Sequence, residues 1–389
     1  MSKAALEQLE QYQVEIPQAA ERFQNCANLY DRKLWHQLTE ELEAIISEVP
    51  EVNNGDFLIR LYEGFVAGFG HRLNLLKLAK MAVQAAGQFG APAQAVSFLE
   101  RVQHQIRDAK LAREEGQPLL YLQSHIAQYK LAGGEVAECK TMNEDNHTAL
   151  ASLHDVDPSV SAAVHFTSSQ YFKYVKDFAE FYKASLQYLA FVSSEELPKE
   201  QKLPLAVDIS LAALLGDSIY NFGELLLHPI VKVLEDSPHA WLLAMLQAFH
   251  AGDMGAYDHV CTAHATTLNS MPALVQNERK LREKITILCL MELIFSLPAE
   301  QRTIPLSAIG QRTRLGLDGV EFLLMKTLSM HLIEGVIDQV DGNVQVSWVQ
   351  PRVLTLPQIK GLGARLNDWM SKVNSAHLTL EDDAVLEIE

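Results

Sequence analysis

The spacing of apolar residues changes once along this chain, and this change most constrains the fold. Up to about residue 280, apolar residues recur in steps of three and four, as in the series Tyr171, Val175, Phe178 and Tyr182. This spacing places them on one face of an α-helix. Beyond that point, a stretch near residue 340 alternates apolar and polar residues, which is the period of a β-strand. We therefore expect a long helical part followed by a small part that contains strands.

The helical part is predicted to be a stack of helical hairpins. Its apolar segments are separated by short breaks with turn residues, such as Gly133-Gly134 and Asp157-Pro158. In one hairpin, the apolar run Trp241–Phe249 is followed by Gly252, which suits a helix C-terminus, and by Asp253, which suits the next N-cap. Stacked hairpins of this kind form a right-handed solenoid of the tetratricopeptide type. No strict consensus recurs, so the repeats are degenerate.

The later part has the element order of a winged helix. An apolar helix around 285–297 precedes a short extended piece at 303–306, two helices, and then two β-rich runs, 336–340 and 344–349. Asp341-Gly342 between these runs is a strong hairpin signal. We expect Val344, Val346 and Trp348 to share one face of the second strand.

A last helix is predicted from about residue 357 to 375, followed by an acidic tail at 381–389 that we expect to be mobile. The helix carries an apolar stripe with no obvious partner in its own chain: Ile359, Leu362, Leu366, Trp369 and Val373. The fold class is thus mainly α. The predicted domains are helical repeats at 1–170, helical hairpins at 171–282, a winged helix at 283–350, the last helix at 351–380 and the tail.

The sequence contains no motif that predicts catalysis or a cofactor. HExxH, GxxxxGK[ST] and GxSxG are all missing. The closest resemblance to a metal site is His259, Cys261 and His264, but offsets of two and five scatter these side chains around a helix. We expect no catalytic residue, no metal and no cofactor or small-molecule substrate, and hence not an enzyme.

Charge and cysteine usage narrow the partners and the compartment. The formal net charge of −17 disfavours binding to nucleic acid, and residues 303–352 hold four Lys or Arg against five acids, with no basic stripe. The four cysteines are scattered without a CxxC pair, which indicates reduced thiols. No signal-peptide core or membrane-length apolar run is apparent. The expected localisation is cytoplasmic and nuclear, with no membrane partner.

Three segments resemble the PCI-domain family. They are Leu246–Tyr257, which is similar to its helical repeat, Ile304–Asp338, which is similar to its winged-helix signature, and Asp338–Leu354, which is most similar to lid subunits of the 26S proteasome regulatory particle. The resemblance implies a solenoid that leads into a winged helix. It also implies a non-catalytic scaffold role in ATP-dependent degradation of ubiquitinated proteins.

The same resemblance implies the partners and the surface. PCI subunits dock side by side through their winged helices and gather their C-terminal helices into a bundle. We therefore expect other PCI-type lid subunits as partners, with a ubiquitin receptor among the candidate regulatory-particle components. The expected interface residues are Val344, Val346 and Trp348 of the wing and the stripe of the last helix. Two alternatives stay open: a PCI subunit of the signalosome or of a translation or mRNA complex, and a winged-helix nucleic-acid binder.

Overall fold

The computed structural model describes residues 2–53, 55–108, 116–193, 197–298, 302–353 and 356–386. The chain packs as two compact units, residues 1–199 and 200–389, called here the first and the second unit. Each unit is described by itself.

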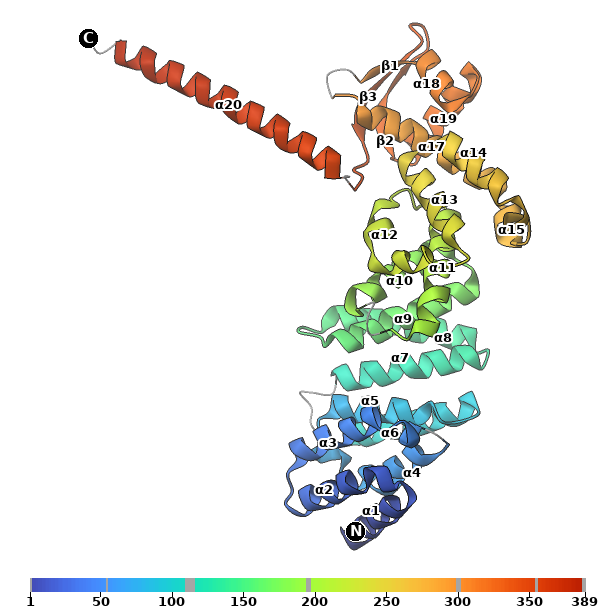
Figure 1. Cartoon of the computed structure of the whole chain (residues 1–389), viewed down its shortest axis with the longest axis vertical. Helices are drawn as coiled ribbons and strands as arrows, with labels where there is room; N and C mark the ends of the chain where they lie inside the picture. Colours follow the sequence, from blue (N-terminus) through green and yellow to red (C-terminus); the bar gives the residue numbers. More distant parts are fainter. Residues whose placement is uncertain are drawn as a thin grey trace. The chain divides into compact units, whose positions relative to one another are not determined.

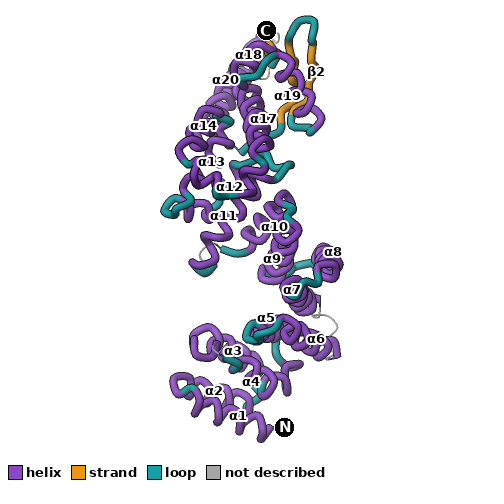
Figure 2. The backbone as a smooth tube through the Cα atoms, turned by 90° about the vertical axis from the view of Figure 1, so that its right-hand side faces the viewer, coloured by secondary structure: helices purple, strands orange, loops and turns teal. Residues whose placement is uncertain are grey.

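The first unit is a succession of α-helices in which neighbours along the chain pack together (Figures 1 and 2). Helix α7 contacts α5 and α6 on its N-terminal side and α8 and α9 on its C-terminal side, which is the neighbour-only packing of a helical-repeat stack. The helices are α1 (Ser2–Glu15), α2 (Ala20–Asp31), α3 (Trp35–Glu48), α4 (Phe57–Gly64), α5 (Leu75–Ala86), α6 (Pro92–Asp108), α7 (Gly116–Ala132), α8 (Val136–Ser152), α9 (Pro158–Val175) and α10 (Phe178–Phe191).

A continuous apolar core runs through the first seven helices, from Leu9 in α1 to Ile126 in α7. Aromatic rings contact one another within it, such as Trp35 against Phe69 with ring centroids 5.6 Å apart. Asp157 and Asp177 cap α9 and α10 by accepting hydrogen bonds from the backbone N–H groups of Ser159 and Glu180. The predicted break at Asp157-Pro158 is thus confirmed as a helix start.

The second unit begins with further helices and then changes to a mixed module. Its elements are α11 (Lys199–Leu215), α12 (Gly223–Leu227), α13 (Ala240–Ala251), α14 (Met254–Ala263), α15 (Ala265–Asn269), α16 (Pro272–Gln276), α17 (Glu278–Ser296), β1 (Thr303–Pro305), α18 (Leu306–Thr313), α19 (Leu317–Ser329), β2 (Ile333–Asp338), β3 (Asn343–Val349) and α20 (Leu356–Leu386).

The α13–α14 hairpin has the predicted end signals. Gly252 has φ +61°, and a Cβ there would lie 2.8 Å from the carbonyl oxygen of Leu288 in α17. Glycine therefore permits both the left-handed backbone and the close approach of α17. Asp253 accepts hydrogen bonds from the N–H groups of Gly255 and Ala256 at 2.8 and 3.1 Å. The two signals predicted from sequence are confirmed.

The winged helix is present as predicted: α17, β1, α18, α19 and a β2–β3 hairpin. The antiparallel sheet has the order β1-β3-β2, so β3 is central and β2 lies at an edge. The turn glycine, Gly342, has φ +63°. Mainly α, with helical repeats, a winged helix and a C-terminal helix, is thus confirmed as the fold class.

Two boundaries differ from the expected ones. Helix α20 runs on to Leu386, beyond the predicted end at 375 and into the segment predicted to be a mobile tail. Residues 387–389 lie outside the described residues. The predicted boundary at 170/171 falls inside α9, whereas the two units divide at 199/200. The finer division of the chain into five parts stays a prediction.

Candidate assembly surface

The wing presents a different face from the one predicted. Val344 and Val346 point into the module and are buried, as is Val349, whereas Trp348 is 39% exposed. The register explains this difference. Glu334 pairs with Trp348 and Gly335 with Val346, so one residue, Ser347, is extra on β3 at this point. Such an irregularity reverses which side of the sheet the following residue faces.

This arrangement corrects part of the predicted interface. The side chains of Val344 and Val346 belong to the chain's own core, where no partner can reach them. Trp348 remains available on the outer face. Strand β2 lies at the sheet edge, and Val336 on it and Val340 just after it are exposed. An edge strand with exposed apolar residues can pair with another chain.

Helix α19 also carries apolar residues toward solvent. Leu317, Phe322 and Met325 are exposed, while Val320, Leu323 and Leu324 are buried beneath them. In a DNA-binding winged helix, the corresponding position would need side chains that read base edges. The exposed residues here are instead suited to contact with protein.

The predicted stripe of α20 is exposed along its whole length. Ile359, Leu362, Leu366, Trp369 and Val373 are all exposed, with Trp369 at 66%. Every residue from 359 to 378 is exposed except Gly363, which is half-buried. In Figure 1, α20 is the red helix that ends near the C-terminus. A helix with one apolar face and no cover from its own chain is typical of a bundle element that packs against other chains.

The segment that follows β3 is held by a residue that the sequence did not single out. Arg352 is buried, and its guanidinium donates to Glu292 of α17 at 2.5 Å and to the carbonyl oxygen of His250. Burial lowers the pKa of Arg352, while the charge of Glu292 opposes this shift. Burial and the nearby Arg352 cation also lower the pKa of His250.

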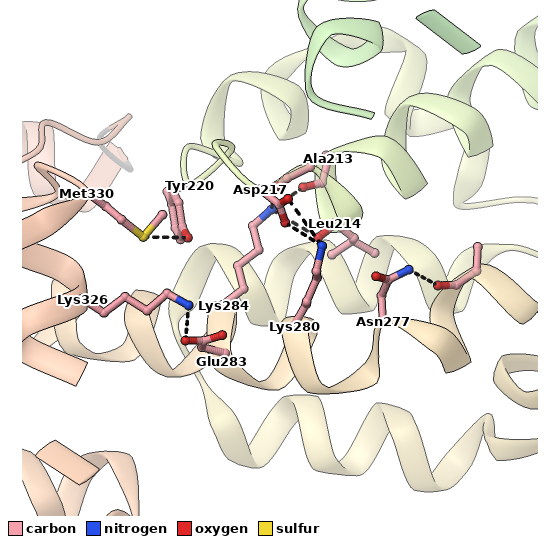
Figure 3. A network of polar contacts seen from close by, with 12 residues as sticks. Ala213, Leu214, Asp217, Tyr220, Asn277, Lys280, Glu283, Lys284, Lys326 and Met330 are labelled. Carbon is pink, nitrogen blue, oxygen red and sulfur yellow. Dashed lines mark hydrogen bonds and ion pairs between the residues drawn. The ribbon is translucent and has the colours of Figure 1, made fainter. Parts of the chain in front are cut away.

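A second anchor joins α17 to the end of α11. Lys284 is only 6% exposed, and its Nζ donates to the carbonyl oxygens of Ala213, Leu214 and Gly216 at 2.7, 3.2 and 2.7 Å. Figure 3 shows the Lys284 side chain directed toward Ala213 and Leu214 in the last turn of α11, and Gly216 follows the end of that helix. The last carbonyls of an α-helix have no partner within the helix.

Two features of the surroundings shift the pKa of Lys284 in opposite directions. Burial lowers the pKa of Lys284 to about 7, and the charge of Asp217 acts in the other direction. Three carbonyl acceptors also match the three N–H donors of an ammonium group, and the ring of Phe222 lies 5.2 Å from Nζ. The charged form therefore ties α17, and with it the winged helix, to the hairpins that precede it.

A metal site needs several ligating side chains that lie close together. Among the described residues, no three His, Cys, Asp or Glu side chains are grouped so that they could hold a metal ion. Cys261 is half-buried, and Tyr257 beside it contributes to the inward face of α14. No helix within the described ranges is both long and apolar enough to span a membrane.

Comparisons with known proteins agree with this architecture. The family described as PSD13 N-terminal repeats matches residues 22–246, and the family described as PCI domain matches residues 261–348. The chain is 49% identical to 26S proteasome non-ATPase regulatory subunit 13 homolog B of Arabidopsis thaliana, over 97% of each chain.

More distant relatives cover nearly as much. The chain is 34% identical to 26S proteasome non-ATPase regulatory subunit 13 of Dictyostelium discoideum, over 98% of this chain and 97% of the relative. It is 32% identical to 26S proteasome regulatory subunit RPN9 of Saccharomyces cerevisiae, over 92% of each. The similarity therefore extends through both units.

Proposed function

Because the chain belongs to the family of 26S proteasome non-ATPase regulatory subunit 13, we propose that it is a non-catalytic scaffold subunit of the regulatory-particle lid. In this role it supports the ATP-dependent degradation of ubiquitinated proteins by holding other subunits in place. Its place of action is then the cytoplasm and the nucleus. The observation that carries the proposal is the uncovered apolar stripe of α20.

The stripe suits a helical bundle formed with sibling subunits. Its members lie three or four residues apart, so they fall on one side of α20. Their exposure is unfavourable in a lone chain, because the free energy falls when a large apolar side chain leaves water. Packing against helices of other chains removes this cost.

The wing supplies a second contact. Strand β2 is an edge strand, and Trp348 lies on the outer face of its neighbour β3. A winged helix of another PCI-type lid subunit can pair with the edge of β2 and cover Trp348. The helical repeats of the first unit are then free to support other regulatory-particle components, and a ubiquitin receptor is one candidate.

Affinity purification of the tagged full-length chain followed by mass spectrometry tests the proposal. We expect proteasome lid subunits to be recovered in near-equal amounts with the chain. Recovery of signalosome or initiation-factor subunits without proteasome subunits would favour a PCI subunit of another complex and overturn the proposal.

Binding to nucleic acid is the remaining alternative, and a gel shift at micromolar protein tests it. A nucleic-acid binder would retain the probe at low salt and lose it steeply as salt rises. Since α19 exposes Phe322 and Met325 and carries Glu321, we expect no shift at any salt concentration.

A further inference from the structure

An open groove of about 740 Å³ lies between α17 and α19, apart from the wing edge and the stripe of α20. One wall is formed by α17 through Arg279, Arg282 and Thr286. The other is formed by Leu315 and by Phe322 of α19. Phe322 is 66% exposed, although it is a large apolar ring. The groove therefore offers apolar surface that the described part of the chain leaves uncovered.

The rim of the groove is positive on a strongly acidic chain. Four cations line it, Arg279, Lys280, Arg282 and Lys326, with one carboxylate, Glu283. The net charge of the whole chain is −17. A positive rim on such a chain attracts a partner that is more acidic than its surroundings.

Three of these four cations each form an ion pair with a different carboxylate of the chain. Lys326 pairs with Glu283 and Lys280 with Asp217, as Figure 3 shows, and Arg282 pairs with Asp258 at 3.5 Å. Lys280 and Arg282 are exposed despite these pairs. Arg279 has no ion pair with any residue that the structure describes. A partner carboxylate can thus reach Arg279 directly and share Arg282.

The backbone of the walls decides the form of the partner. The walls are formed by α17, by α19 and by Leu315 in the turn before α19, and none of them is a strand. An extended peptide would therefore find no strand edge to pair with. A helix satisfies its own backbone and needs only an apolar face for Phe322 and Leu315. We propose that this groove binds an amphipathic, acidic helix of another protein, with its apolar face on Phe322 and its carboxylates toward Arg279 and Arg282.

Nucleic acid fits the same groove less well. Most of its cations are already paired, whereas phosphates need several that are free. The helix-binding groove depends on the proposed scaffold function in one respect only, namely that the chain acts in contact with other proteins.

Fluorescence anisotropy with the full-length chain tests the groove. The probe is a labelled, designed helical peptide with leucines on one face and glutamates on the other. We expect saturable binding that Phe322→Glu weakens at least tenfold. The control Leu317→Glu places the same charge at an exposed site of α19 outside the groove and should leave binding within twofold. Equal binding by the wild-type chain and Phe322→Glu, or no binding by the wild-type chain, would overturn the proposal.

Two further measurements separate the other outcomes. Arg279→Glu together with Arg282→Glu should weaken the peptide at least tenfold and flatten its dependence on salt. A labelled oligonucleotide that binds in competition with the peptide would contradict the choice of a protein partner.

Co-purification of Phe322→Glu with lid subunits reports on the proposed function alone. If peptide binding is lost while co-purification persists, the groove serves a partner beyond the scaffold contacts.

Discussion

Sixteen large apolar side chains of the second unit are exposed among the described residues, against five of the first unit: Val14, Leu34, Tyr174, Val175 and Phe191. Buried polar residues show the opposite distribution, with eleven in the first unit and five in the second. The first unit thus places more polar groups inside, and the second places more apolar groups outside. Helical repeats can complete their packing with neighbours in the same chain, whereas the winged helix and α20 leave surface that only another chain can cover.

Part of the polar interior of the first unit is a small hydrogen-bond network between α8 and α9. The Oγ of Ser168 donates to Oδ1 of Asn143 at 2.8 Å, and Nε2 of His147 lies 2.7 Å from the same hydroxyl. The ring of His165 stacks on Phe191 with an angle of 3° between planes. Such a network specifies which helix faces meet, because a mismatch would leave buried polar groups unpaired.

The largest effect is expected at the polar anchor of the second unit. Lys284→Met keeps the apolar stem but leaves three carbonyl groups at the end of α11 without their donor. We expect the free energy of unfolding to fall by about 3 kcal/mol, because a buried carbonyl group that loses its donor costs about 1–3 kcal/mol. Chemical denaturation of the full-length chain measures it, with Lys280→Met, at an exposed ion pair, as a control that should change stability by less than about 0.5 kcal/mol. Equal stability of the two variants would show that Lys284 anchors nothing.

The next largest effect is expected in the first unit, whose stability should fall at acid pH. Burial lowers the pKa of His125 and of His165 to about 4, and for His165 the nearby His147 adds to the shift. Both are neutral when folded, whereas the unfolded chain takes up protons near pH 6.5. Stability is therefore complete above about pH 6.5 and is lost as pH falls toward 4, by up to about 3 kcal/mol for each histidine.

Hydrogen exchange at α7 and α9 between pH 7 and pH 4.5 checks this expectation. His165→Phe keeps an aromatic ring beside Phe191 but cannot titrate, so its exchange at α9 should depend less on pH. A variant with the same pH dependence as the wild-type chain would mean that the acid effect arises elsewhere. In the second unit, burial and the Arg352 cation likewise lower the pKa of His250 in α13. Hydrogen exchange at α13 therefore provides the comparison between the two units.

A smaller effect separates the two faces of the wing. Val346→Ala removes buried methyl groups and should destabilise the chain by about 2 kcal/mol. Trp348→Ala removes a larger side chain from the outer face and should cost less than about 1 kcal/mol. Thermal unfolding of both variants measures the difference. A larger loss for Trp348 would place that ring in the core and reverse the contrast.

Features that depend on neighbouring residues could be predicted from the sequence, whereas features that depend on tertiary contacts could not. Gly252 and Asp253 were identified from residue type alone, because a left-handed cap and an N-cap depend on the few residues around them. Trp348 was placed on the wrong face because an extra residue in β3 depends on its pairing with β2. Lys284 and Arg352 gave no signal, since their partners lie 60 or more residues away in sequence. The stripe of α20 was predicted correctly because helical spacing alone defines it.

The smallest effect on stability is expected where the consequence for assembly is greatest. Leu362→Asp with Leu366→Asp places two charges on the exposed stripe of α20. Since both leucines already face solvent, the free energy of unfolding should change by less than about 0.5 kcal/mol. Incorporation into the assembly, measured by co-purification, should fall at least tenfold, because a partner helix would have to bury two unpaired carboxylates. Ala364→Asp with Ser371→Asp adds the same charge to the opposite face and should incorporate normally. If both double variants incorporate equally, the stripe is not a docking face, and its exposure would no longer distinguish the second unit from the first.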